Sequence, residues 1–261
     1  MTKSFQVKIN KIDDKLEKSL YSLLAPKGFY GDYDKKNIYE VSKKYSINKK
    51  LLISLRSQFL KSKVIEKHYM VKKFKNNLLS EYSNNSVLDL CKKYDIAPLT
   101  IMRMIILEKY NFKISENKIK KLKDNDKKQL EIALNNDITS QLNQDSVMDE
   151  SIKYEQKIGR ALSKKGIKYK TQEDLTEEQT EKYGYAVITP DFLFDQEINL
   201  NGENIKWMEI KNFYGSNIKY FKNKIKKQLT KYKNKWGKGC VVFRYGFNSE
   251  LKFDDNVIIS F

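Results

Sequence analysis

Histidine and cysteine are scarce in this sequence of 261 residues. Its only histidine is His68, and its two cysteines, Cys91 and Cys240, lie far apart, as is usual in a reducing compartment. So few of these residues argue against a structural zinc site of the usual kind. A Ser-His-Asp or Cys-His mechanism would depend entirely on His68, which has no motif around it. If the chain is an enzyme, its chemistry must therefore use carboxylates, lysine and a hard metal ion.

Long apolar runs are also absent. No run approaches the ~20 residues that a membrane-spanning helix needs, and residues 1–11 lack the apolar segment of a secretory signal. These two absences predict an intracellular, soluble protein that does not enter a membrane.

Positive charge is abundant instead. Lys and Arg number 51 against 33 Asp and Glu, which gives a formal net charge of +18. Nucleic acid is the plain partner for such a chain, because phosphates bind Lys and Arg with release of counterions. An anionic membrane surface is the alternative partner. The abundance of Lys, Asn, Ile and Tyr together is typical of a codon-biased genome, and this weakens the argument from charge.

The first half of the chain has a helical pattern. Leucines at helical spacing predict a helix over residues 13–24, and Pro26 and Gly28 end it. Residues 41–47 (Val-Ser-Lys-Lys-Tyr-Ser-Ile) then match residues 90–96 (Leu-Cys-Lys-Lys-Tyr-Asp-Ile). Each copy is followed by an apolar run of helical spacing, so the pattern predicts two similar helix pairs.

This internal repeat resembles a helix-turn-helix unit. The functional interpretation is DNA binding, with the second helix in a major groove. The structural alternative is a helical hairpin that contacts no DNA. Lysines in and beside the repeat favour DNA contact only slightly, because a charged run is usually a solvated face. They are Lys43, Lys44, Lys49, Lys50, Lys92 and Lys93. We predict a helical, DNA-binding region over residues 1–145.

The pattern changes after a polar linker that we place at residues 135–146. Residues 146–261 are predicted to form one compact domain, with a mixed sheet flanked by helices. The fold class is therefore α/β, of the mixed α+β type, preceded by the all-helical region. Asn201-Gly202 between two apolar runs is a strong hairpin signal. The expected helices are residues 154–164 and 217–236, and the expected strands are residues 185–194, 198–200, 205–210, 239–245 and 257–261.

Polar residues interrupt the apolar pattern of this domain at a few positions. In an extended strand, Ile205, Trp207, Glu209 and Lys211 share one face. A carboxylate and an ammonium on a half-buried face carry a desolvation cost unless they are paired or liganded. Asp191 follows Pro190, which suggests an edge, a bulge or a strand opening that aims the aspartate toward Glu209.

Two helical residues join this set. Glu155 shares a helix face with Ile158 and Leu162, and Gln228 lies among the apolar positions of the long helix. Because both helices should pack on the sheet, Glu155, Asp191, Glu209, Lys211 and Gln228 are expected to converge. The alternatives are ordinary ones: an ion pair between Glu209 and Lys211, a turn role for Asp191, and solvent exposure for the two helical residues.

The chemistry that such a group supports is phosphodiester hydrolysis. Carboxylate oxygens suit Mg²⁺ or Mn²⁺. A metal ion held by Asp191 and Glu209 can polarise a phosphodiester and acidify water. Lys211 can orient the attacking water or neutralise developing charge.

The order of short motifs resembles a known superfamily. Pro190-Asp191 followed by Glu209-Ile210-Lys211 is similar to the core motif of the PD-(D/E)XK nucleases. Thr189-Pro190-Asp191-Phe192, Asn201-Gly202 and residues 205–211, with residues 235–239 and 245–247, look like the TPD-motif family, which is the family of the codanin-interacting nuclease. The match covers about residues 155–251 well.

The resemblance implies a restriction-endonuclease-like fold, dependence on Mg²⁺ or Mn²⁺ and a nucleic-acid substrate. It implies that Lys211 is the catalytic lysine and that residues 228–232 correspond to the Gln-x-x-x-Tyr element of RecB-like and exonuclease branches. The metal ligands that it suggests are Asp191, Glu209, Glu155 and Ile210. One departure is Ser216, where we would expect an acidic residue.

The long helix adds an argument about substrate. Between Asn217 and Lys238 there are nine lysines and no acidic residue, so this segment can follow a phosphate backbone. A solvated helix face is the alternative. Tyr214, Tyr220 or Tyr232 are candidates to stack on a base. The residues that we select for nucleic-acid binding are Lys219, Lys222, Lys226, Lys231, Tyr232 and Lys235.

Together these patterns predict a Mg²⁺- or Mn²⁺-dependent deoxyribonuclease with DNA as the favoured partner. The basic run at residues 118–123 is compatible with nuclear import, so the nucleus or another site of DNA metabolism is favoured. The alternatives are a catalytically silent nucleic-acid-binding protein and an adaptor that binds another protein. The oligomeric state stays open.

Overall fold

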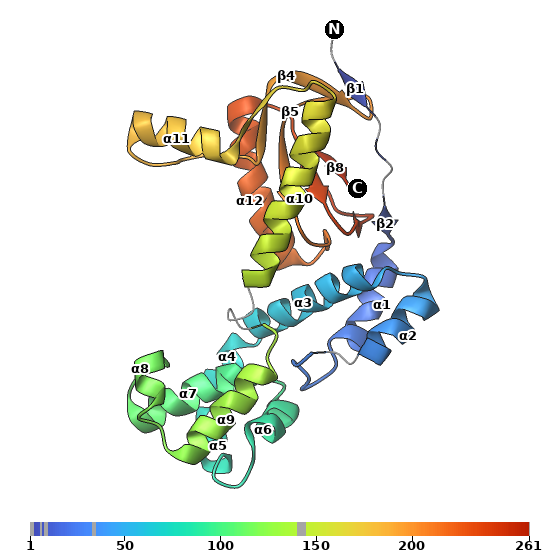
Figure 1. Ribbon diagram of the computed structural model, residues 1–261. Coiled ribbons are helices and arrows are strands. Elements are labelled where there is room, and N and C mark those ends of the chain that lie inside the picture. Colours follow the sequence, from blue (N-terminus) through green and yellow to red (C-terminus); the bar gives the residue numbers. More distant parts are fainter. Residues whose placement is uncertain (1–2, 6, 8–9, 33–34, 140–144, 261) are drawn as a thin grey trace. The chain divides into compact units, whose positions relative to one another are not determined.

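The computed structural model describes residues 3–5, 7, 10–32, 35–139 and 145–260. They form a mixed α/β structure with helices through the N-terminal region (Figure 1), which confirms the expected fold class. The chain divides into two compact units. The sheet unit comprises Met1–Lys18 and Gln144–Phe261, and the helical unit comprises Ser19–Asn143. Residues 1–18 therefore group with the sheet, whereas the sequence pattern had assigned them to the helical region.

The sheet unit is built on a mixed sheet with the strand order β1-β4-β5-β6-β8, and β3 pairs with β4 as well. The β4–β5 and β3–β4 pairs are antiparallel, and the β1–β4, β5–β6 and β6–β8 pairs are parallel. A separate parallel pair joins β2 and β7. The strands are β1 (Ser4–Phe5), β2 (Lys11–Ile12), β3 (Tyr169–Thr171), β4 (Phe192–Leu200), β5 (Glu203–Lys211), β6 (Cys240–Phe243), β7 (Phe247–Asn248) and β8 (Val257–Ile259).

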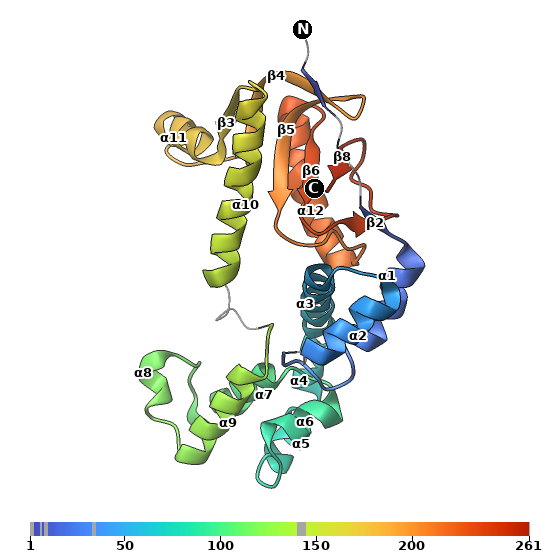
Figure 2. The same cartoon turned by 45° about the vertical axis from the view of Figure 1, so that its right-hand side comes forward.

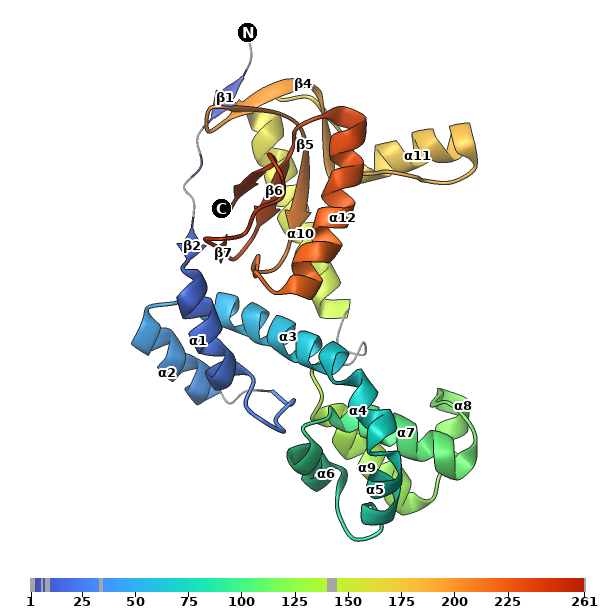
Figure 3. The same ribbon diagram turned by 180° about the vertical axis from the view of Figure 1, so that it is seen from behind.

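Helices cover both faces of this sheet. Helix α10 (Asp145–Lys164) packs on one face and α12 (Lys219–Trp236) on the other, as Figures 2 and 3 show from two sides. The α10 face has a core that includes Ile158, Met208 and Ile210. The core of the α12 face includes Trp207 and Leu229. The two expected helices are thus present, with α10 beginning earlier and α12 slightly later than the sequence pattern indicated.

The expected hairpin forms between β4 and β5. Asn201 and Gly202 have φ angles of 51° and 89°. Both therefore lie in the left-handed region that tight two-residue hairpin turns require and that Asn and Gly tolerate best. The strict alternation expected along β5 fails at Ile205, which packs with Met208 and Ile210 rather than with Trp207. The β4–β5 pairing shifts register between Leu193 and Ile198, at the level of this residue.

The strand expected over residues 185–194 begins only at Phe192, so its first part was wrong. The cause is helix α11 (Gln172–Tyr183), which the sequence pattern did not predict and which projects from the sheet in Figure 1. Gln179 of α11 donates to the Ile188 carbonyl at 2.6 Å and accepts from the Val187 and Ile188 amides at 2.8 and 2.9 Å. One side chain thus satisfies the backbone groups that a neighbouring strand would otherwise have bonded.

In the helical unit, both copies of the repeat form a helix, a turn and a second helix. Ser46 and Asp95 occupy equivalent turn positions with φ angles of 53°, and Ile47 and Ile96 are buried behind them. Contact with DNA stays a prediction. The helices of this unit are α2 (Lys35–Tyr45), α3 (Lys49–Glu66), α4 (His68–Lys73), α5 (Lys75–Glu81), α6 (Val87–Tyr94), α7 (Pro98–Tyr110), α8 (Glu116–Ile119) and α9 (Asp124–Asn135).

Two segments complete the chain. Helix α1 (Asp14–Leu24) begins in the sheet unit and continues into the helical unit, close to the expected bounds. Residues 140–144 of the expected linker and residue 261 of the last expected strand lie outside the described residues. Within the described part, no helix combines the length and hydropathy needed to cross a membrane.

Candidate active site

The end of strand β5 carries a hydrogen-bonded cluster that faces α12. The Lys211 ammonium donates to Glu209 Oε1 at 2.6 Å and to Gln228 Oε1 at 3.0 Å. Gln228 in turn donates through Nε2 to Glu209 Oε1 at 2.8 Å and to the Tyr232 hydroxyl at 2.8 Å. Tyr232 donates to the Thr189 carbonyl at 3.2 Å. The cluster therefore links β5, α12 and the segment just before β4.

Asp191 lies at the start of β4, beside this cluster. Phe192 pairs with Met208 in an antiparallel register, so the preceding residue, Asp191, lies opposite Glu209. Its Oδ2 accepts a hydrogen bond from the Ile210 amide at 2.5 Å. Burial, then the neighbouring Glu209 carboxylate, raises the pKa of Asp191 to about 8, and Glu155 adds to this effect against the opposing hydrogen bond from Ile210.

Glu155 approaches the same place from α10. It is partly buried and accepts a hydrogen bond from Ser151 at 3.0 Å. Burial raises its pKa, and the Glu209 carboxylate contributes in the same direction, while Ser151 and Lys211 oppose the shift. The structure thus brings together all of Glu155, Asp191, Glu209, Lys211 and Gln228.

Glu209 has an oxygen that the protein leaves unsatisfied. Glu209 is only 4% exposed, and its Oε2 has no hydrogen-bond partner among the described residues. A buried carboxylate oxygen without a donor is costly, and a divalent cation is a natural partner for it. The donor set of Asp191 and Glu209 therefore fits a hard metal ion.

This set would need further ligands. Among the described residues, no group of three or more His, Cys, Asp or Glu side chains is arranged to hold a metal ion. Mg²⁺ commonly binds one or two carboxylates and completes its shell with water and substrate oxygens. The Ile210 side chain is buried in the core, so this residue could contribute only its main-chain carbonyl.

A comparison with protein families matches residues 122–260 to a family described as a protein of unknown function with the TPD sequence motif. The match covers more than half of the 261 residues. The chain belongs to the TPD sequence-motif family. Thr189-Pro190-Asp191 has the residues for which the motif is named, and Asp191 lies beside the cluster described above.

One relative of this TPD protein is an uncharacterized protein of Acanthamoeba polyphaga mimivirus. The two are 30% identical over 117 residues, which is 43% of this chain and 41% of the viral protein. The chain thus spans less than half the length of that relative. No solved structure matches the chain.

The lysines of α12 divide into two groups. Lysines of the first group bind polar side chains of the sheet unit. Lys222 donates to Asn217 at 3.1 Å, and Lys226 pairs with Asp254 at 3.0 Å. Others are exposed and form no ion pair with the described residues: Lys219, Lys224, Lys227, Lys231 and Lys235.

Three members of the exposed group lie on the side of α12 that carries Gln228. Lys224 precedes it by four residues, and Lys231 and Lys235 follow it by three and seven, which are spacings of one helix face. Lys224 was not among the residues selected from sequence, although this spacing could have identified it. Tyr232 is buried in the cluster and Tyr214 is fully buried, so neither ring is available to stack on a base. Tyr220 remains exposed.

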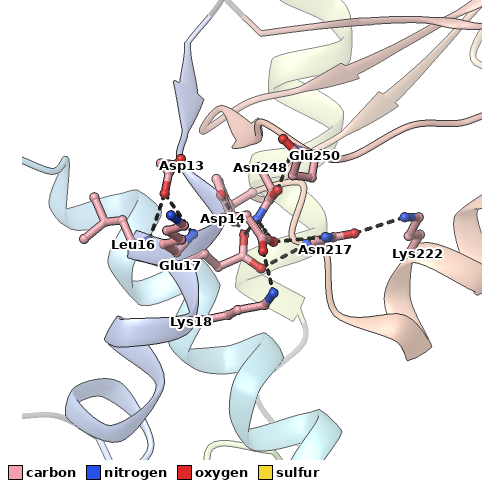
Figure 4. Close-up of polar contacts among 11 residues, drawn as sticks. Asp13, Asp14, Leu16, Glu17, Lys18, Asn217, Lys222, Asn248 and Glu250 are labelled. Carbon is pink, nitrogen blue, oxygen red and sulfur yellow. Dashed lines mark hydrogen bonds and ion pairs between the residues drawn. The ribbon is translucent and has the colours of Figure 1, made fainter.

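The loop after β5 is hydrogen-bonded to Glu17, a buried acidic residue that the sequence analysis did not select. Glu17 of α1 is 4% exposed and accepts from the Tyr214 hydroxyl at 2.8 Å. It also accepts from the Asn217 amide at 3.0 Å and from Asn248 Nδ2 at 2.8 Å (Figure 4). This TPD chain has Ser216 where the resemblance led us to expect an acidic residue. Glu17 now supplies a carboxylate to that loop from a segment about 200 positions away.

Proposed function

We propose that the sheet unit is a divalent-metal-dependent nuclease that hydrolyses phosphodiester bonds, with DNA as the favoured substrate. The observation that supports this most is the position of Asp191 opposite Glu209, beside Lys211. Burial and the neighbouring carboxylates raise the pKa of Asp191, and its one amide donor does not offset them. Strongly perturbed groups gathered at one place are typical of catalytic sites. The arrangement also agrees with the PD-(D/E)XK motif to which the sequence is similar.

Asp191 and Glu209 would hold the metal ion, with Glu155 and the Ile210 carbonyl as further candidates. When bound, Mg²⁺ or Mn²⁺ would polarise the phosphodiester and increase the acidity of water. The unsatisfied Oε2 of Glu209 is the part of the donor set that most needs this partner.

The remaining residues have roles in positioning and charge. The Lys211 ammonium is held by Glu209 and Gln228, so it can orient a water molecule or stabilise negative charge that develops on the phosphate. Gln228 fixes Lys211 and is itself fixed by Tyr232. Because Tyr232 also bonds to the Thr189 carbonyl, it connects α12 to the Thr-Pro-Asp segment.

The test is cleavage of labelled single-stranded, duplex and branched DNA by purified protein in Mg²⁺, in Mn²⁺ and in EDTA. We expect metal-dependent cleavage that Asp191→Asn abolishes and that Lys211→Met slows by on the order of 10²–10³. Asp195→Asn is a matched control, because Asp195 lies four residues after Asp191, in β4, and is exposed. Equal cleavage by the wild type and the two site variants would assign the activity to a contaminant and reject the proposal.

A nucleic-acid-binding protein without catalysis is the second candidate. The observation that favours it is the ion pair between Lys211 and Glu209, at 2.6 Å, which is also what an ordinary structural pair would show. Calorimetric titration with Mn²⁺ separates the two. A nuclease should bind Mn²⁺ at a site that Asp191→Asn weakens, whereas a silent binding protein should bind DNA equally well in the presence of EDTA and show no such metal site.

A further inference from the structure

A groove runs along α10 and reaches the candidate active site. Its volume is about 580 Å³, and its walls are α10 on one side and β3 with the start of β4 on the other. Asp191 and Glu155 both line it. Neither the motif resemblance nor the selected lysines of α12 assigned any role to this groove. We call it the α10 groove.

The floor of the α10 groove is closely packed against the helix. Tyr169 and Phe192 line it, with ring centroids 4.8 Å apart in an edge-to-face arrangement. A Cβ atom at Gly159 would lie 2.9 Å from the Tyr169 hydroxyl and 3.3 Å from the Phe192 ring. Glycine in a helix interior costs about 1 kcal/mol relative to alanine. At position 159 its missing side chain leaves the space that allows Tyr169 and Phe192 to pack against α10.

The rim of the groove carries two cations. Arg160 and Lys164 line it, one helical turn apart on α10, and both are exposed. Neither has an ion pair or side-chain hydrogen bond with the residues that the structure describes. The acidic residues that line the groove are Glu155 and Asp191 of the candidate site. A groove that borders the candidate carboxylates and carries two unpaired cations on its rim matches the charge of a phosphodiester backbone.

We propose that the α10 groove binds one strand of DNA next to the phosphate that is cut, with Arg160 and Lys164 contacting backbone phosphates. This inference rests on the proposed nuclease function and specifies its substrate. The volume lies within the roughly 300–1,000 Å³ of small-ligand sites. A groove of this volume can hold a short stretch of one strand but cannot hold a whole duplex. The substrate should be unpaired on the side that enters the groove.

The test measures equilibrium binding of a fluorescent single-stranded DNA in EDTA, so that no cleavage occurs. The double variant Arg160→Gln/Lys164→Gln should bind about tenfold or more weakly, and its slope of log affinity against log salt should fall by about 1.4, or ~0.7 for each lost phosphate contact. Lys157→Gln is the matched control, because Lys157 is exposed on the same helix and does not line the groove. It should leave the affinity unchanged.

A second variant tests the groove by volume rather than by charge. Gln156 lines the groove and is exposed, so Gln156→Trp should fill part of it without disturbing the core. We expect weaker binding of the single strand and unchanged binding of a blunt duplex. Unchanged single-strand affinity in both variants would overturn the proposal, as would an effect seen with duplex or RNA alone.

Failure of this proposal and failure of the nuclease function give different results. Cleavage by the wild type with no effect of either groove variant on binding or cleavage rejects the groove alone. Single-strand binding that depends on Arg160 and Lys164, without cleavage in Mg²⁺ or Mn²⁺, rejects the nuclease and keeps the groove.

Discussion

Asp95 in the helical unit and Asp191 in the sheet unit are both withdrawn from solvent, but their surroundings differ. The Asp95 carboxylate pairs with Lys63 at 2.6 Å and with Lys67, and it accepts from the Gly28 amide at 2.7 Å. Burial alone would raise the pKa of Asp95, yet these lysines and the amide lower it below its ordinary value. The charge of Asp95 is thus fully compensated within its unit.

Asp191 has the opposite balance. Burial and the neighbouring Glu209 and Glu155 carboxylates raise its pKa to about 8, because a single amide and the partly shared Lys211 do not offset them. A buried acid that the protein compensates is a structural element. A buried acid without a compensating charge, close to other acids, ionises only at a cost unless a cation binds beside it. A metal-dependent site has this property.

Glu17 is an intermediate case in the sheet unit. Burial raises its pKa, although hydrogen bonds from Asn248, Tyr214 and Asn217 act against this. Its donors are neutral, so they satisfy the oxygens without cancelling the charge. All three donors come from the loop after β5 and from β7, which indicates a structural role in holding that loop.

The largest effect that sharpens this comparison is expected at Asp95. Asp95→Ala would leave Lys63, which is 3% exposed, buried without its carboxylate. Breaking a buried pair in this way costs about 3–5 kcal/mol. The measurement is urea unfolding followed by far-ultraviolet circular dichroism, which reports mainly on helices.

Tryptophan fluorescence supplies an internal reference for this experiment. The chain has two tryptophans, Trp207 and Trp236, and both belong to the sheet unit. Glu131→Ala is the control substitution, because Glu131 lies on α9 in the same unit, is exposed and forms no ion pair with the described residues. A loss no greater than that of Glu131→Ala would mean that the compensated pair contributes little.

A smaller effect is expected at Glu17. Glu17→Ala removes the buried carboxylate that accepts hydrogen bonds from Tyr214, Asn217 and Asn248, at a cost of about 1–3 kcal/mol in the free energy of unfolding. Tryptophan fluorescence during urea unfolding measures it, with Lys15→Ala, an exposed change in the same helix, as the control. If Glu17→Ala were as stable as the wild type, the assignment of a structural role would be wrong.

The sequence predicted the parts of the site that depend on local periodicity. Alternation along β5 placed Glu209 with Lys211, and helical spacing in α12 directed Gln228 toward them. The Asn201-Gly202 turn predicted that β4 pairs with β5, but Asp191 comes opposite Glu209 only because the register shifts between Leu193 and Ile198, and no sequence signal indicated this shift. The predicted features depend on neighbours a few residues apart, so a single sequence contains them.

Features that depend on distant segments were not predictable in the same way. Glu17 reaches its loop from nearly 200 residues away, and no spacing connects them. Gln179 replaces a strand partner for residues 187–188, so an apolar run with strand propensity stays irregular. The Arg160 and Lys164 pair shows a helical spacing, but only the fold reveals that a groove lies beside it.

The smallest expected effect is the pH dependence of the stability of the metal-free protein, which arises from Asp191. It tests the comparison of Asp191 with Asp95 most directly. The folded-state pKa of about 8 lies above the ordinary value of 3.8, so the native state binds more protons than the unfolded state between these values. Stability therefore falls as pH rises through this window. Between pH 7 and pH 8 the expected loss is about 1 kcal/mol.

Asp191→Asn should remove that loss, because its neutral amide cannot ionise, and it should make the metal-free protein more stable than the wild type at pH 8. Denaturant titrations at pH 7 and pH 8 in EDTA measure the difference, with Asp195→Asn as the control that keeps the wild-type slope. Added Mn²⁺ should stabilise the wild type at pH 8 by mass action and should stabilise Asp191→Asn less, because the variant binds the ion more weakly. A variant that follows the wild-type pH profile, or that is less stable at pH 8, would place Asp191 with Asp95 among the compensated acids and remove the electrostatic basis for a metal site.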